Sequence, residues 1–369
     1  MSGPPIRRKR APRWAALAVP ALAAGIWLAS APRDVSADVA SPALAKYQDA
    51  VDNALDRALA WLAQEQQKNG SWARQGGPRN VTGITSLAVM AFLAKGHVPG
   101  VGPYGEVINK GVDFVLESQQ SNGMIIRGNE GHGPMYSHNI STLMLSEVSG
   151  MVDPARQKKI DAVLAKALKV ILTAQQMAKD DRSAGGWRYQ CDSRDSDISC
   201  TGWAVMALRS ARNNGAAVPR DAIDRGIAYV MRCQNRGDGG FAYQPGGASG
   251  WGRTGTALLC LELCGRHRDR YALMAGEWVL KHLPRRHGDG EHFSYALYYC
   301  AQGMFQLGDD YWDRFAAQMY DIMLKVQEKD GRWSPGGGEN EGEAGAYYST
   351  SMAVLAMSVP YRQLPIYQR

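Results

Sequence analysis

One structural unit recurs along this chain: an apolar helical stretch runs into a glutamine and then into a glycine-rich turn, which usually closes on an aromatic residue. The five glutamines are Gln66, Gln119, Gln175, Gln234 and Gln327. Successive glutamines are 53 (119−66), 56 (175−119), 59 (234−175) and 93 (327−234) residues apart. The last interval has room for a sixth unit with a decayed signature, which we place at Trp278 and Val279. Six copies of one supersecondary unit bury their apolar faces against one another and can close into a ring.

Two kinds of helical stretch alternate along the chain. Those that carry the glutamines, such as 47–67 and 161–176, are amphipathic, which is typical of helices at a surface. Those between the signatures are almost uncharged and apolar on all sides, so we expect them to be buried. They cover 82–92, 139–148, 201–208, 254–263, 295–304 and 349–357. No strand-like alternation competes with this pattern. The sequence therefore predicts an all-α fold over residues 46–360, an α6/α6 toroid of two concentric rings around a central cavity.

The N-terminal region has the pattern of an export signal. Basic residues at 7–10 and 13 precede an apolar run over 14–29, and 35–37 (Val-Ser-Ala) fits a cleavage site. The apolar run of about 16 residues is shorter than the roughly 20 that a membrane-spanning helix needs, which favours cleavage over an uncleaved anchor. We predict a signal peptide over 1–37, a linker over 38–45 and a C-terminal tail over 361–369. The expected location is the periplasm or cell envelope, with anchoring through 14–29 as the alternative.

The charge balance gives little support to a nucleic-acid partner. The whole chain carries a net charge of +7. Removal of residues 1–37 takes away six Lys or Arg and one Asp, which leaves about +2. We therefore expect no nucleic-acid partner, whereas association with a membrane surface stays open.

The six cysteines fall into two groups. Cys191 and Cys200 flank a polar loop of eight residues, whereas the other four lie in apolar helical stretches, where buried thiols are common. An oxidising compartment would allow a disulfide to persist. We predict that Cys191 and Cys200 pair, with a stabilisation of about 2–3 kcal/mol. No spacing of Cys and His is typical of a zinc site.

The repeat signature resembles the QW repeat of squalene cyclases and protein prenyltransferases. The resemblance rests on Trp61 and Leu62 followed by Gln66 and Gly70-Ser71-Trp72, and on the matching residues around Gln119, Gln234 and Gln327. It covers essentially all of 46–360, and the order of units is similar to that of secreted bacterial proteins with prenyltransferase and squalene oxidase repeats. The resemblance implies a terpenoid cyclase-like toroid. We expect the repeat itself to be structural: the glutamine bonds helix-terminal backbone groups, and the aromatic packs on the neighbouring hairpin.

One segment resembles the acid motif of class II terpene cyclases, in which Gly-Gly-Trp precedes Asp-x-Asp-Asp. Here Gly185-Gly186-Trp187 is followed by Asp195 and Asp197, but the family's last Asp is Ile198. The resemblance implies that Asp197 is a protonated acid that donates to an alkene or epoxide, with Asp195 in support, because clustered carboxylates in a dry cavity cannot all ionise. The alternative, which we favour, is that Asp195, Asp197 or Ser199 caps the following helix.

The resemblance to protein prenyltransferases does not extend to their zinc site. Those enzymes bind zinc through an Asp, a Cys and a later His, whereas the segment 240–260 lacks the Asp-x-Cys pair and the last inner helix lacks a His. We therefore expect neither a metal nor another cofactor.

Further candidates follow from position, because the starts of the inner helices of such a toroid converge on one mouth. Tyr136 and His138 could form an acid–base pair, although a structural His is favoured. Arg253 could bind a diphosphate or carboxylate, or form a buried ion pair with Glu262 or one of the loop acids. The aromatic candidates could face a carbocation, stack on a sugar or simply pack. The full set of predicted substrate-binding residues is Tyr136, His138, Trp203, Arg253, Tyr295, Tyr298 and Tyr348. The glycine-rich segment 334–343 lacks a phosphate-loop Lys and is predicted to be a surface loop.

Three functions remain open at this point. The resemblance favours an exported toroid that binds or cyclises an isoprenoid lipid, with a hydrophobic small molecule as its partner. The alternatives are a non-catalytic binding or scaffold protein of the envelope and a polysaccharide lyase or glycosidase, since α/α toroids host both. The lining of the cavity distinguishes them: apolar and aromatic for a lipid, polar with exposed aromatics for a sugar, and closed for a scaffold.

Overall fold

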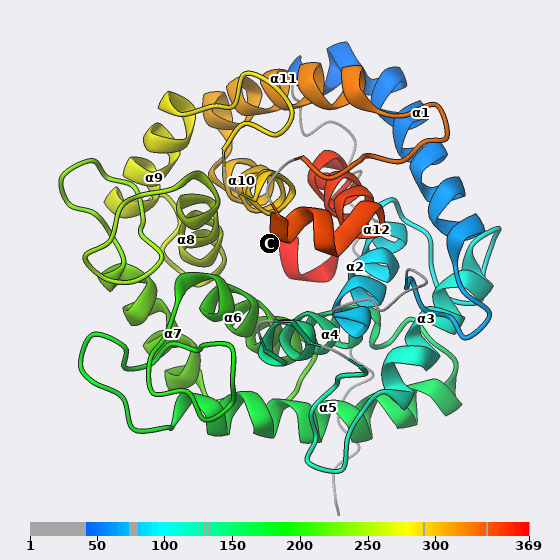
Figure 1. Ribbon diagram of the computed structural model, residues 1–369, viewed down its shortest axis with the longest axis horizontal. Helices are drawn as coiled ribbons and strands as arrows, with labels where there is room; N and C mark the ends of the chain where they lie inside the picture. The colour runs from blue at the N-terminus through cyan, green and yellow to red at the C-terminus, as the bar shows by residue number, and fades with distance from the viewer. Residues whose placement is uncertain are drawn as a thin grey trace, which may run out of the picture. The chain divides into compact units, whose positions relative to one another are not determined.

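The alternation of amphipathic and apolar segments produces two concentric rings of helices (Figure 1). The computed structural model describes residues 42–73, 80–128, 130–131, 133–290, 292–336 and 339–368. The outer ring consists of α1 (Pro42–Glu65), α3 (Gly105–Glu117), α5 (Pro154–Gln175), α7 (Arg220–Arg232), α9 (Arg270–Lys281) and α11 (Asp309–Val326). The inner ring consists of α2 (Val81–Ala94), α4 (Met135–Val148), α6 (Ile198–Asn213), α8 (Trp251–Leu263), α10 (Phe293–Leu307) and α12 (Glu339–Met357). The predicted α6/α6 toroid is confirmed, including a fifth outer helix around Trp278.

The burial of each helix follows its sequence pattern. Every residue of α2 is buried, as the lack of charge predicts. By contrast, α7 buries one stripe that includes Ile223, Ile227 and Val230, and exposes its charged face. The inner helices approach one another closely, because a Cβ atom at Gly202 of α6 would lie only 2.4 Å from Cγ2 of Thr256 on α8. Each inner helix contacts the next, and α12 returns to pack on α2, which closes the ring.

The glutamine of the repeat joins neighbouring outer helices. Gln175 Nε2 donates to the carbonyl of Gly185 in its own turn, at 2.7 Å, and to that of Ala222 in α7, at 2.8 Å. Gln66 and Gln119 form the same two kinds of bond with their own turn and the next outer helix. Gln327 completes the circle, since its Nε2 donates to Ala54 in α1 at 2.7 Å. The exception is Gln234, whose nearest acceptor is the sulfur of Met274 at 4.0 Å.

The aromatic of the repeat is equally structural. The indole N–H groups of Trp72, Trp187 and Trp333 donate to carbonyls near the end of the preceding outer helix, at 2.7–2.9 Å. The backbone N–H of each of these residues donates to a threonine hydroxyl on the inner helix that follows. The turn itself needs glycine: Gly185 has φ +85°, and a Cβ atom there would lie 2.6 Å from the carbonyl oxygen of Arg225.

The end of the inner ring opposite its helix starts is covered by the C-terminal segment. Two short 3₁₀ helices, η1 (Val359–Tyr361) and η2 (Pro365–Tyr367), follow α12. Leu364, Ile366 and Tyr367 are buried there, and the Gln306 amide donates to the Tyr367 carbonyl at 3.0 Å. The sequence predicts 361–369 as a tail outside the toroid, whereas the structure packs 364–367 against the inner helices.

Two further predictions need correction or lie outside the structure. The segment 334–343 is not all loop: α12 begins at Glu339 and runs to Met357, with a non-helical Gly345 (φ 76°) inside it. The predicted signal peptide and cleavage site over 1–37 lie outside the described residues, and α1 begins within the predicted linker, at Pro42. Over the described ranges the structure contains isolated β-bridges but no β-strand, and none of its helices has the length and apolarity that crossing a membrane requires.

Candidate functional site

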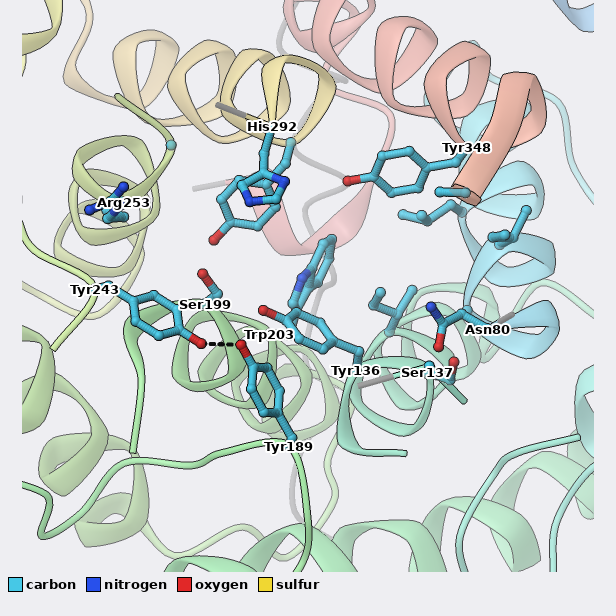
Figure 2. Close-up of a pocket in the computed structure, with 18 of the residues that line it drawn as sticks. Asn80, Tyr136, Ser137, Tyr189, Ser199, Trp203, Tyr243, Arg253, His292 and Tyr348 are labelled. Carbon is cyan, nitrogen blue, oxygen red and sulfur yellow. Dashed lines mark hydrogen bonds between the residues drawn. The ribbon is translucent and has the colours of Figure 1, made fainter. Parts of the chain in front are cut away.

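A cavity of about 740 Å³ opens where the inner helices begin (Figure 2). All six inner helices, or the turns before them, contribute to it, as the convergence of helix starts predicts. Aromatic side chains dominate its wall: Tyr136, Tyr189, Trp203, Tyr243, Trp251, Tyr295 and Tyr348. Ile84, Leu87 and Ile140 add aliphatic surface, while Asn80, Ser137, Ser199, Ser249, Arg253 and His292 supply polar groups. No Asp or Glu is among the described residues that line this cavity.

Two wall residues that the sequence analysis did not select form a hydroxyl pair. Tyr189 and Tyr243 point their hydroxyl groups toward each other, and these share a short hydrogen bond (Figure 2). Each tyrosine stands two residues after the aromatic of its repeat, Trp187 in one unit and Phe241 in the next. Comparison of the repeat units could therefore have found them, since adjacent units place equivalent positions side by side.

Asp197 is the N-cap of α6, as the favoured interpretation predicts. Its Oδ1 accepts from the Cys200 N–H at 2.8 Å, and its own N–H donates to the Trp187 carbonyl at 2.9 Å. The side chain is fully buried, and Oδ2 has no hydrogen-bond partner, although it lies 3.5 Å from Arg188 Nη1. Burial raises the pKa of Asp197 to about 6, against the opposing effects of the Cys200 N–H and Arg188. Asp197 is not among the lining residues, so its catalytic role stays a prediction.

Asp195 does not give Asp197 the support that the resemblance implies. Its side chain is 51% exposed and faces Arg188, with Nε and Oδ2 3.3 Å apart. The raised pKa of Asp197 comes from burial, and Asp195 is not among its causes. A solvated carboxylate that is already paired with a guanidinium has little influence on a neighbouring acid.

His138 is a structural residue rather than a partner of Tyr136, which corrects its place among the substrate-binding candidates. Nδ1 accepts from the Ile125 N–H at 3.0 Å, and Nε2 lies 3.1 Å from the Ala167 carbonyl. Both ring nitrogens are therefore occupied, and burial lowers the pKa of His138 to about 4. His138 stands where the other units have threonine: it lies 13 residues after Ile125, as Thr85 lies 13 residues after Trp72.

One other candidate, Tyr298, also needs revision. Tyr298 lies behind the wall: its ring stacks on Trp203 at 5.5 Å, and its hydroxyl bonds that of Tyr367. Arg253 lines the cavity but does not pair with Glu262, which binds His267 and the Arg268 N–H. Arg253 and Glu262 lie nine positions apart on α8 (262−253), which corresponds to about 13 Å along a helix. Tyr136, Trp203, Tyr295 and Tyr348 line the cavity as expected.

The predicted disulfide is not formed. Cys191 and Cys200 are both free, one exposed in the polar loop and the other wholly buried in the first turn of α6. The Cys200 thiol is instead in contact with Asp197 and Tyr136, and burial raises its pKa well above the ordinary value. Among the residues that the structure describes, no group of three or more His, Cys, Asp or Glu side chains is arranged to hold a metal ion.

A second acid lies close to the mouth of the cavity. Glu130 precedes the lining residue Gly131 and accepts from the Arg127 N–H at 3.3 Å. Burial raises the pKa of Glu130 to about 7, although the nearby Ser137 hydroxyl and the Arg127 N–H act in the opposite direction. Near neutral pH this carboxyl is therefore partly protonated.

Two closed rings of helices around one aromatic cavity define a single α/α toroid. The family model described as prenyltransferase alpha-alpha toroid domain matches residues 36–178 and 158–291, and the chain belongs to this family. No relative among curated protein sequences matches the chain.

Solved structures of similar fold include members of two classes of enzyme. The type II terpene cyclase MstE from Scytonema, without ligand, superposes with a TM-score of 0.54 at 16% identity, over 86% of this chain and all of its own. A glycosidase variant in complex with glucose gives 0.55 at 12% identity, over 87% of this chain and 99% of its own. A family 76 glycoside hydrolase from a bovine Bacteroides thetaiotaomicron strain gives 0.63 at 9% identity, over 85% and 78%. At such identities the likeness concerns the fold alone.

Proposed function

We propose that this protein is an exported toroid that binds an isoprenoid-type hydrophobic small molecule in its central cavity. The observation that carries the proposal is the wall of seven aromatic rings around about 740 Å³, with no carboxylate among the described lining residues. This volume lies within the roughly 300–1,000 Å³ of small-molecule sites. Burial of a ligand's apolar surface in a cavity of this kind favours binding. A glycosidase, by contrast, needs paired carboxyl groups at its site. Export is supported by the basic and apolar pattern of residues 7–29.

The substrate bound in one solved structure of similar fold supports the proposal of an isoprenoid-type ligand. One solved structure of MstE holds geranylgeranyl dihydroxybenzoate as its substrate, at 15% identity to this chain and a TM-score of 0.54. A toroid of this size can therefore enclose a polyprenyl chain. The ligand of the present protein follows from its own lining, which is aromatic and aliphatic on the walls and polar at scattered points.

Blocking the cavity tests the proposal. Ile140 lines the cavity from α4, and Ile140→Trp would fill part of it without burying a charge. We expect binding of a C15 prenyl alcohol, followed by calorimetry, to weaken by at least about tenfold while the fold persists. Val101→Trp, at a site that is 64% exposed, is the matched control. Equal binding by both variants, or preferential binding of oligosaccharides, would contradict the proposal.

A second function, acid-initiated cyclisation, is favoured by one observation. The buried Oδ2 of Asp197 has no hydrogen-bond partner, and the pKa of this carboxyl is raised to about 6 by burial. A neutral carboxylic acid can donate a proton to an alkene in a dry site. Because Asp197 does not line the cavity, binding is the better supported proposal. Product analysis by mass spectrometry after incubation with a linear prenyl substrate separates the two functions.

A further inference from the structure

Two buried polar atoms lie at the edge of the cavity where α2 and α4 begin. They are the amide oxygen Oδ1 of Asn80 and the hydroxyl oxygen Oγ of Ser137, and both residues line the cavity. Figure 2 shows these oxygens turned toward each other, and a Cβ atom at Gly83, in the first turn of α2, would lie only 3.1 Å from Ser137 Oγ. Neither atom has a hydrogen-bond partner among the residues that the structure describes. We call Asn80 and Ser137 the polar corner.

Asn80 immediately precedes α2 but does not cap it. An N-cap residue normally has an extended backbone, which brings its side-chain oxygen to the N–H groups of the first turn. Asn80 instead has φ 59° and ψ 39°, in the left-handed region that Asn tolerates, and its side chain makes no capping hydrogen bond. Its amide oxygen is therefore not used by the helix and stays available at the cavity.

Ser137 does not donate within its own helix. Buried serines further along the inner helices, such as Ser86 and Ser146, donate to the carbonyl four residues earlier. Ser137 lies in the first turn of α4, which begins at Met135, so the helix offers no carbonyl at that position. The Ser137 side chain is nevertheless fully buried. A hydroxyl group in such a place needs a partner from outside the helix.

Comparison of the repeat units shows that the fold does not require a polar side chain at this position. Ser137 directly precedes His138, which accepts the Ile125 N–H as a threonine does in other units. The equivalent position in the first unit, before Thr85, is Ile84. The hydroxyl of Ser137 is thus a feature of this one unit, and the cavity is the space that it adjoins.

The chemistry of the polar corner selects a hydroxyl group. Asn80 Oδ1 can only accept, so a ligand must supply the hydrogen, whereas the Ser137 hydroxyl can donate or accept. An alcohol satisfies both atoms, but an ether, a carbonyl or a hydrocarbon leaves Oδ1 without a hydrogen. An anion would bring only acceptors. It would also meet the Glu130 carboxyl, which lies near Ser137 and, with a pKa of about 7, is partly ionised near neutral pH.

We propose that the polar corner binds a hydroxyl group of the ligand, which donates to Asn80 Oδ1 and bonds the Ser137 hydroxyl. The ligand is accordingly an isoprenoid-type alcohol rather than a hydrocarbon, an ether or a diphosphate. Ile84, Leu87 and Ile140 line the same cavity and supply apolar surface for its remainder. This inference rests on the proposed binding function and narrows its substrate class.

Four probes with the same prenyl chain test the inference on the purified full chain: farnesol, its methyl ether, farnesene and farnesyl diphosphate. By calorimetry, farnesol should bind about two- to tenfold more tightly than its methyl ether, which keeps the oxygen but lacks the hydrogen. Farnesol should also bind more tightly than farnesene and the diphosphate.

Two variants assign the preference to the polar corner. Asn80→Gly keeps the left-handed backbone and removes the amide, so it should bring the ratio of farnesol to ether affinity close to one. Ser137→Ala should lower the ratio of farnesol to farnesene affinity by about two- to tenfold. Ser351→Ala is the matched control, because the Ser351 hydroxyl is also buried and has no partner among the described residues, but Ser351 does not line the cavity. It should keep both wild-type ratios.

The outcomes separate this inference from the proposed function. Equal affinity of the wild type for farnesol and its ether, as expected if the corner holds only water, would overturn the inference and leave the proposed function intact. Tighter binding of the diphosphate, or an unchanged ratio in either corner variant, would do the same. Failure of the wild type to bind any of the four probes would overturn both. The comparison of probes on the wild type does not depend on whether the variants fold.

Discussion

Glu147 and Asp197 are buried carboxyl groups at opposite ends of the inner ring, and they differ in how fully their oxygens are satisfied. Glu147, near the end of α4, accepts from the Ser210 hydroxyl through Oε1 and from the Ile366 N–H through Oε2, the latter at 3.0 Å. Asp197, at the start of α6, accepts from Cys200 through Oδ1 only. Burial raises the pKa of both, to about 7 for Glu147 and about 6 for Asp197.

The difference distinguishes the closed end of the toroid from the end at which the proposed site lies. At the sealed end the C-terminal segment closes over Glu147 and satisfies both oxygens, as a stable core requires. At the mouth end, Oδ2 of Asp197 is buried near the aromatic cavity and has no hydrogen-bond partner. Buried polar groups that are only partly satisfied are expected at functional sites. Four measurements test this comparison.

The largest expected effect is loss of the seal. Ending the chain after Tyr361 removes the buried residues Leu364, Ile366 and Tyr367 and leaves Oε2 of Glu147 without its donor. We expect the free energy of unfolding to fall by about 3–5 kcal/mol. Denaturant unfolding measures it, with deletion of 368–369 alone as the control. A loss below about 1 kcal/mol would show that the segment does not seal the ring.

The second effect is a pH dependence that arises at the sealed end. Folding raises the pKa of Glu147 from its ordinary 4.5 to about 7. The native protein therefore retains a proton that the unfolded chain releases, so stability falls as the pH rises from 4.5 to about 7. The change corresponds to about 3 kcal/mol. Glu147→Gln should remove this contribution when unfolding is measured between pH 4.5 and 7.5. A constant difference between wild type and variant across this range would contradict the assignment.

A smaller effect separates a repeat glutamine that bonds two backbone carbonyls, Gln327, from one that does not, Gln234. Gln327→Ala removes the hydrogen bonds that the side-chain amide donates to the carbonyls of Ala54 and Gly331, both at 2.7 Å. The bond to Ala54 connects the last repeat unit to the first. We expect a loss of about 1–3 kcal/mol. Gln234→Ala is the matched control and should cost less, because its amide reaches only the Met274 sulfur at 4.0 Å. Equal losses would mean that the backbone bonds do not stabilise the ring.

The smallest expected change in stability is at the mouth. Asn is as good an N-cap as Asp, so Asp197→Asn should change the free energy of unfolding by less than about 1 kcal/mol. Ligand binding should persist. If the protein is a cyclase, turnover of an isoprenoid should fall by about 10²–10⁴-fold, because the transferable proton is gone. Easy unfolding of the variant, with unchanged ligand binding once folded, would assign Asp197 to capping alone.

Most of the fold could be predicted from the sequence, because the repeat is encoded within each unit. The glutamine bonds its own turn and the aromatic bonds its own outer helix, so spacing along the chain is informative. The decayed fifth unit was predictable from the length of its interval. The C-terminal seal was not, since Ile366 and Tyr367 acquire their partners from α4 and α10, far away in the chain.

The candidate site was predicted only in part. Tyr136, Trp203, Arg253, Tyr295 and Tyr348 were found from their position at helix starts, but His138 was misleading because it replaces a structural threonine. The prediction of a disulfide was wrong for a related reason. A loop of eight residues is long enough for its two ends to be joined, but Cys200 is buried in a helix while Cys191 remains exposed.

The sequence by itself determined the repeat, the two classes of helix and hence the toroid, because these depend on local periodicity and on contacts between successive units. Only the tertiary structure decided which side chains meet in the cavity, which acids lose solvent and which hydroxyl groups pair. Those properties depend on the convergence of six inner helices whose residues, from Asn80 to Tyr348, lie far apart in the chain. Burial and hydrogen-bond partners are set by that convergence, and no spacing within a single unit encodes it.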